Sequence, residues 1–170
     1  MNAAVWFGAA IFFTFWAGAA PFSPEMKELL GPKTSPYFSG AIAQIFVARY
    51  FQLQLVCGLV ALLHLLAEWI YFGRTPQKRR LGLLIGLVAI GLVGGYWLQP
   101  KMKELHKIKY GVGVKSSIEQ REAADHSFRI WHGTSQGINL LLLAGLAVYL
   151  WRVANPAEPA RFVSTANFRG

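Results

Sequence analysis

The most constraining feature of this sequence is the absence of charge from four long windows. Residues 1–24, 50–67, 81–100 and 130–151 contain no Asp, Glu, Lys or Arg. Each window is close to the roughly 20 residues that an α-helix needs to cross the hydrocarbon core of a bilayer. Charged residues make up only 15 % of the chain, against about 25 % in a soluble domain. The pattern excludes a soluble globular enzyme, a nucleic-acid-binding domain and a disordered chain.

The windows predict an all-α integral membrane bundle of four transmembrane helices in one domain, because only helices with satisfied backbones can cross a bilayer in this way. Prolines are expected to stop the first helix and to end or kink the third. The expected helices cover about 3–20, 41–72, 81–99 and 117–151.

An extra amphipathic helical segment is expected between the third and fourth helices. It lies within the charged residues 100–129 and is broken near Gly111 and Gly113. Ser116 and Glu119 have the spacing of a capping box, which predicts a helix start there. The transmembrane domain then covers residues 1–151, and residues 152–170 form a polar tail.

The charge pattern indicates how the chain meets its membrane. The 17 Lys and Arg residues exceed the 8 acids, and they gather in short segments beside the apolar windows. Contact with membrane lipid headgroups explains this pattern, and nucleic acid is not expected as a partner. The short basic turn 73–80 contains no acid, which favours a multi-pass protein of the cell membrane with both termini in the cytoplasm.

Small and aromatic residues suggest how the helices pack. Trp6 and Trp16 are expected at the membrane–water boundary, and Cys57 is expected to be a buried, inert thiol. The third helix carries two G-x-x-x-G pairs, which permit close helix contacts. It could therefore hold a protein partner or a second copy of the chain, although the same glycines could be used within the bundle. The pairs are Gly82 with Gly86 and Gly91 with Gly95.

A polar stripe runs along the fourth helix. Its members are spaced by three and four residues, which places them on one face. Such a stripe can form hydrogen bonds between helices, or it can line a polar cavity, an ion path or a ligand pocket. The stripe consists of Glu122, Asp125, Arg129, His132, Gln136 and Asn139.

The ligand hypothesis places this stripe opposite the second helix, around a small polar cavity. Arg49 is expected at the same level as Arg129 and His132, where the cluster could receive a headgroup, a carboxylate or a small anion. His64 and Glu68 form a second polar pair, one turn apart on the second helix. The candidate ligand-binding residues are Arg49, Gln52, Arg129, His132, Ser135, Gln136 and Asn139.

No catalytic residue, metal site or resident cofactor is expected. Ser135 and His132 lack an exposed nucleophile elbow or an oxyanion arrangement. His64 and His132 lie too far apart in depth, by about 18 Å, to share one haem iron. A haem b held by a single histidine stays open, as does a metal ion held by His106, His126 and His132.

Several segments resemble a bacterial integral membrane family, domain of unknown function 4149, which is transmembrane-protein-205-like. The similar segments are Trp6-Phe7-Gly8 leading into Ile11-Phe12-Phe13, Arg49-Tyr50-Phe51, and His132-Gly133-Thr134-Ser135 with Asn139. The resemblance implies an integral four-helix membrane protein and brings no established biochemistry. A more distant similarity to copper-resistance D-type and haem-handling membrane proteins would imply a metal or haem.

The sequence thus predicts a non-enzymatic, polytopic membrane protein. It is expected to bind a small solute, ion or lipid headgroup in the polar cavity between its second and fourth helices. The alternatives are an accessory subunit of a larger respiratory or photosynthetic membrane complex, and a haem- or metal-binding membrane protein.

Overall fold

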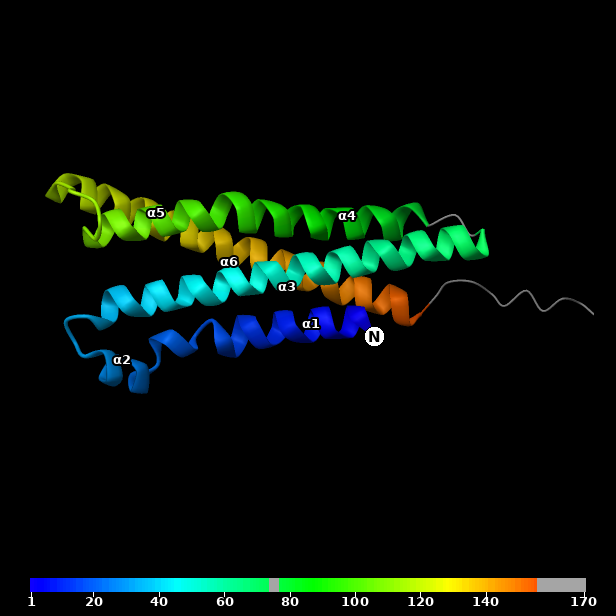
Figure 1. Ribbon diagram of the computed structural model, residues 1–170, viewed down its shortest axis with the longest axis horizontal. Helices are drawn as coiled ribbons and strands as arrows, with labels where there is room; N and C mark the ends of the chain where they lie inside the picture. The colour runs from blue at the N-terminus through cyan, green and yellow to red at the C-terminus, as the bar shows by residue number, and fades with distance from the viewer. Residues whose placement is uncertain (74–76, 156–170) are drawn as a thin grey trace, which may run out of the picture.

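The computed structural model describes residues 1–73 and 77–155, and every regular element in these ranges is helical. Among the described residues, four helical stretches are long and apolar enough to span a membrane (Figure 1). The predicted all-α bundle is therefore confirmed. The stretches are Asn2–Leu30, Ser35–Tyr71, Lys78–Tyr110 and Ile118–Ala154.

Neighbouring helices in the bundle follow the order of the chain. Helix α1 (Asn2–Phe12) packs against α3 (Ser35–Phe72) and α6 (Ile118–Ala154), and α4 (Lys78–Val93) packs against the same two helices. Helices α3 and α6 therefore lie diagonally across the bundle, with the other two between them. This corrects the expectation that the second and fourth helices face each other as direct neighbours. The start of α1 and the end of α6 lie at the same end of the molecule (Figure 1).

The first stretch is interrupted at its prolines, as the sequence predicts, and becomes helical again after them. A π-helical turn, Phe13–Ala17, and a short 3-10 turn, Ala20–Phe22, follow α1. The next helix, α2 (Pro24–Leu30), begins with proline in its first turn, where the missing backbone N–H costs no hydrogen bond. The Ser23 hydroxyl accepts a bond from the Met26 N–H and caps this helix.

The third stretch continues through its proline, so of the two expected outcomes the helix does not end there. A π-helical segment, Gly94–Leu98, joins α4 directly to α5 (Gln99–Tyr110), and Pro100 occupies the first turn of α5. A π turn shifts the hydrogen-bond pattern, so the chain accommodates a residue without an N–H. Helix α5 ends at Gly111, whose φ of 63° is left-handed, and it forms the expected segment outside the third apolar window.

Helix α6 begins with a capping box one residue later than the sequence spacing suggests. The Ser117 side chain accepts from the Gln120 N–H, and the Gln120 side chain accepts from the Ser117 N–H. Ser116 instead bonds to the Ile108 carbonyl at 3.3 Å. The helix continues to Ala154, so the first residues of the expected polar tail are helical. Residues 156–170 of that tail, and positions 74–76 of the basic turn, lie outside the described residues.

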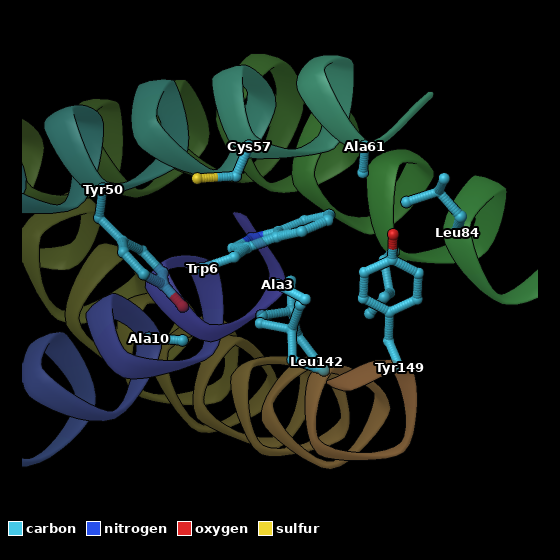
Figure 2. Packing of buried hydrophobic residues seen from close by; sticks show 11 residues of the cluster. Ala3, Trp6, Ala10, Tyr50, Cys57, Ala61, Leu84, Leu142 and Tyr149 are labelled. Atoms are coloured by element: carbon cyan, nitrogen blue, oxygen red, sulfur yellow. The ribbon is translucent and has the colours of Figure 1, made fainter. Parts of the chain in front are cut away.

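The core surrounds Trp6, which is 1 % exposed (Figure 2). Its indole lies between α3 and α6 and meets Tyr149 edge-on, with the ring centroids 6.2 Å apart. This corrects the expected boundary position of Trp6, whereas Trp16 is exposed, at 62 %. The Cys57 thiol is buried in the same core, as predicted.

Glycine permits the closest helix contacts in this core. A Cβ atom at Gly58 would lie 2.7 Å from Val88 Cγ2, and one at Gly94 would lie 2.3 Å from Phe51 Cε1. Gly82 and Gly86, by contrast, have no other heavy atom near an added Cβ. The glycines near the end of the third apolar window therefore pack against another helix, whereas the pair Gly82 and Gly86 faces open space.

The long helices reach beyond a bilayer. At 1.5 Å per residue, a 38-residue helix such as α3 is about 57 Å long, and the hydrocarbon core is about 30 Å thick. In α3 the charge-free window 50–67 leaves residues 35–49 on one side and only 68–72 on the other. The longer piece lies at the end that carries α2 and α5 (Figure 1). We call this part the headpiece, and it consists of residues 35–48 of α3, helix α5, the turn 111–117 and residues 118–129 of α6.

Candidate functional site

Polar side chains hold α1 against α3. The Trp6 indole N–H donates to Gln54 Oε1 across the helix interface, and Asn2 Nδ2 donates to the Cys57 carbonyl at 2.8 Å. Lipid tails are as apolar as a leucine side chain, so apolar burial drives helix association weakly in a bilayer. Buried polar bonds and close packing therefore fix the position of α1.

A second polar group joins three helices near the middle of the bundle. The Tyr50 hydroxyl donates to Asn139 Oδ1 at 3.2 Å, and Asn139 Nδ2 donates to Thr14 Oγ1 at 2.8 Å. Thr14 in turn donates to the Ala10 carbonyl at 2.7 Å. Among the predicted ligand-binding residues, Asn139 thus points into the bundle and bonds to other helices.

Two contacts fix the register between the diagonal helices. Tyr50 of α3 bonds to Asn139 of α6, and His106 of α5 meets both Gly40 of α3 and Phe128 of α6. A residue of α6 therefore lies at the same depth along the bundle as the residue of α3 whose number is lower by about 88 or 89. Arg49 lies level with residues 137–138, roughly 8–13 Å from the levels of Arg129 and His132. By this register the three residues lie at different levels, and binding of a ligand by this cluster stays a prediction.

The outer residues of the predicted cluster bond within their own helices. Arg49 Nη1 donates to Gln52 Oε1 at 2.9 Å on α3, and Gln136 Nε2 lies 3.2 Å from His132 Nε2 on α6. These four side chains are exposed. Ser135 lies between them on α6 and is partly buried. Their role in ligand binding stays a prediction.

The second polar pair, His64 and Glu68, also contacts a charged residue of the next helix. His64 Nε2 lies 3.2 Å from Glu68 Oε1, and Arg80 Nη1 of α4 lies 3.1 Å from Glu68 Oε2. The Arg80 side chain is only 21 % exposed. A guanidinium ion that has lost most of its water is stabilised by a nearby carboxylate. The pair therefore ties the end of α3 to the start of α4.

The histidines do not gather around one metal position. His64 lies level with about residue 152 of α6, so it is roughly 30 Å from His132 along the bundle. Within residues 1–73 and 77–155, no three His, Cys, Asp or Glu side chains converge. His106 is 4 % exposed, whereas His126 and His132 are exposed on α6. The three histidines of the alternative metal site are therefore not assembled in the described part of the chain.

The headpiece carries a hollow with a basic lining, which we call the turn hollow. It has a volume of about 650 Å³ and lies where the turn after α5 meets the start of α6. Arg121 Nε donates to Ser116 Oγ at 3.0 Å, and the guanidinium lies against Gly111, where a Cβ would be 2.5 Å from it. Two cations and no acid line it. The lining residues are Gly111, Gly113, Val114, Lys115, Ser116, Ser117 and Arg121.

A second hollow, of about 630 Å³, continues from Arg121 along the crossing of α5 and α6. We call it the α5–α6 groove. Asp125 Oδ1 lies 2.6 Å from Lys109 Nζ, and Arg129 also bonds to this carboxylate. Hydrogen bonds from Lys109 and Arg129 lower the pKa of Asp125 below its ordinary value. The groove is lined by Lys109, Ile118, Arg121, Glu122, Asp125, His126 and Arg129.

Reasoning from the sequence missed the turn hollow. The polar face of the fourth helix includes Arg129 but not Lys115 or Arg121, so it does not indicate this hollow. The available signal was local: two glycines, a lysine and two serines directly precede the start of α6. Glycine at a turn and hydroxyl groups at a helix start are common where backbone N–H groups face an anion.

These features define a multi-pass, all-α membrane protein with a folded basic headpiece. The family model of a domain of unknown function, DUF4149, matches residues 1–110, and the chain belongs to this family. The match runs from α1 to the end of α5, so the similar segment at His132–Asn139 lies outside it. No curated protein and no solved structure gave a significant match.

Proposed function

We propose that this membrane protein binds an anionic, phosphate-bearing group on its basic headpiece and has no catalytic role. The turn hollow carries the proposal, because Lys115 and Arg121 line it without any acidic residue. Hydrogen bonding to Ser116 holds the Arg121 guanidinium in place, so little ordering is required when an anion arrives. Arginine pairs with two oxygens of a phosphate through its planar fork of N–H donors.

The ligand class is the one that the sequence suggested, namely an ion, a solute or a lipid headgroup. Its position moves from the space between α3 and α6 to the headpiece. Tyr50 and Asn139 already bond to each other in that space, and Arg49 lies at a different level from Arg129. Headgroups lie directly beside a structure that projects from the bilayer, so a phospholipid can present its phosphate to the headpiece.

Binding of lipid to the purified protein tests this proposal. Native mass spectrometry in mild detergent would compare the affinities for phosphatidylglycerol, phosphatidylcholine and inorganic phosphate. Lys115→Gln and Arg121→Gln should each weaken binding of phosphatidylglycerol about fivefold, the effect of about 1 kcal/mol per cation near a membrane surface. Lys103→Gln is the matched control, because Lys103 is exposed on α5 outside both hollows.

The pattern of affinities identifies the source of the phosphate. Tight binding of phosphatidylglycerol with weak binding of inorganic phosphate would support a lipid ligand, and similar binding of both would support a soluble one. Equal losses in Lys103→Gln and Arg121→Gln would contradict the proposal, because unspecific surface charge would then account for the binding.

An accessory subunit is the second candidate function, and the outer face of α6 favours it. His132 and Gln136 are exposed on α6, and so are Gly133 and Gly137, which have open space around an added Cβ. Polar groups on the outside of a membrane helix are costly in lipid and form hydrogen bonds with a partner helix. A partner's membrane helix could approach closely over the two glycines.

Cross-linking tests the subunit function in native membranes. A cysteine at Gly137, in a Cys57→Ala background, should cross-link to a partner helix, and Gln136→Leu should reduce the yield. The control cysteine replaces Ala147, which is exposed on the same helix further along the span. Equal cross-linking at both positions, or none at Gly137, would contradict this function.

A further inference from the structure

A buried histidine joins the three helices of the headpiece. His106 of α5 is 4 % exposed, and its ring stacks on Tyr37 of α3, with centroids 5.2 Å apart. Tyr110 lies at 4.9 Å and Phe128 of α6 at 5.9 Å. An aromatic cluster from α3, α5 and α6 therefore encloses the imidazole.

Gly40 of α3 makes room for this ring. A Cβ atom at Gly40 would lie 2.3 Å from His106 Nε2, so any side chain there would push the ring away. His106 Nε2 is buried and has no hydrogen-bond partner within the described residues, and the same is true of Ser39 Oγ. A proton on Nε2 therefore has no acceptor within hydrogen-bond distance in the described part of the chain.

The charged groups around the ring do not favour its protonation. Lys109 lies one turn further along α5 and pairs with Asp125 of α6. Asp125 is also bonded to Arg129, so its charge is already shared between two cations. Tyr37 is the titratable group that α3 presents to the ring. Burial, with a smaller contribution from Lys109, holds the pKa of His106 below its ordinary value.

We propose that His106 is a proton-sensitive latch that holds α5 against the start of α3. The neutral ring fits over Gly40 and closes the headpiece. Protonation adds a charge to a ring that is buried and has no carboxylate bonded to it among the described residues, so the ring leaves the cluster and α5 separates from α3. This regulation goes beyond the proposed anion binding and does not depend on it.

The sign of the pH dependence follows from the burial of the neutral form. Because the open state binds a proton more readily than the closed state, closing is favoured above the ordinary histidine pKa, about 6.5. The stability of the closed state falls as the pH drops below that value. The headpiece should therefore be closed in neutral solution and open in mild acid.

A distance measurement tests the latch in the full chain. Nitroxide labels attached to Phe38→Cys and Lys107→Cys, in a Cys57→Ala background, report the α3–α5 separation by pulsed electron paramagnetic resonance. Both positions are exposed. In detergent micelles the distance should lengthen between about pH 8 and about pH 5, on either side of the histidine range.

Variants separate the latch from general acid effects. His106→Phe should keep the short distance at both pH values, and Gly40→Ala should give the long distance already at neutral pH. His126→Phe, which changes an exposed histidine, should respond as the parent does. An unchanged distance in the parent, or a normal pH response in His106→Phe, would overturn the proposal.

A histidine titration gives an answer even if His106→Phe does not fold. The ring resonances of His106 in the intact protein should titrate at the same pH as the distance change, as followed by nuclear magnetic resonance. Coincident midpoints would support the latch. A distance change that occurs at the midpoint of another group, or without protonation of His106, would overturn it.

Discussion

The Tyr50 hydroxyl and the Asn139 side chain form a hydrogen bond of 3.2 Å between helices that are not neighbours in the bundle. Thr14 of the first membrane stretch shares the same asparagine, so three of the four stretches meet at one polar point. Bonds of this kind specify one arrangement of helices among the many that lipid would allow.

Asn139→Leu is expected to destabilise the bundle by about 1–2 kcal/mol. The substitution removes two interhelical bonds, each worth roughly 0.6 kcal/mol, and leaves the Tyr50 hydroxyl without its acceptor. Unfolding of the purified protein in mixed micelles, followed by circular dichroism, measures the loss. Gln136→Leu is the control, because Gln136 is exposed and bonds within its own helix. A similar loss in both variants would show that the interhelical bonds of Asn139 do not stabilise the bundle.

Substitution of a closely packed glycine should lower the stability of the protein more than substitution of a glycine that faces open space. Gly58→Leu is expected to cost about 1–3 kcal/mol or more, because the side chain would overlap Val88 and Trp6 in a filled core. Gly86→Leu should leave stability close to that of the parent, since nothing lies near an added Cβ. Thermal unfolding in detergent provides both values. Equal tolerance of the two substitutions would mean that α3 and α4 are further apart than the structure shows.

The ion pair at the other end of the bundle should matter for stability. Glu68→Gln is expected to destabilise the protein by about 1–3 kcal/mol, because Arg80 is largely buried and loses its carboxylate. Glu104→Gln is the comparison, since Glu104 is exposed and meets Lys101 at 3.7 Å. Exposed pairs contribute about 0–1 kcal/mol. Unfolding midpoints for the two variants should therefore differ, and similar midpoints would show that Arg80 has another partner.

Asp125 should titrate at unusually low pH. The hydrogen bonds from Lys109 and Arg129 favour its charged form in the folded state, so its pKa is lowered. Its contribution to stability is complete above the unfolded-state pKa, near 4, and is lost as the pH falls through the folded-state value. Carboxyl resonances measured across acidic pH give the folded pKa. Lys109→Gln should raise it, and an unchanged value would show that Lys109 is not a partner in solution.

Much of the architecture follows from local sequence. The charge-free windows identify the four stretches because a charged side chain is costly in hydrocarbon wherever it faces. The glycine turn after α5 and the serine that begins α6 follow from backbone geometry, although the cap falls on Ser117 and not on Ser116. The turn hollow is also local, because all its lining residues lie between Gly111 and Arg121. The α5–α6 groove is not, since Lys109 meets Asp125 only where α5 and α6 pack together.

The sequence by itself determined that this chain is a helical bundle for a membrane, since the length and polarity of each segment set its partition between water and lipid. Tertiary structure decided which polar side chains meet. Trp6 became part of the core and His132 remained on the outside, although both lie in apolar segments. The physical reason is that the rotation and register of each helix depend on how it packs against its neighbours. Because lipid is as apolar as the core, the pattern of apolar residues does not reveal which face of a helix turns inward.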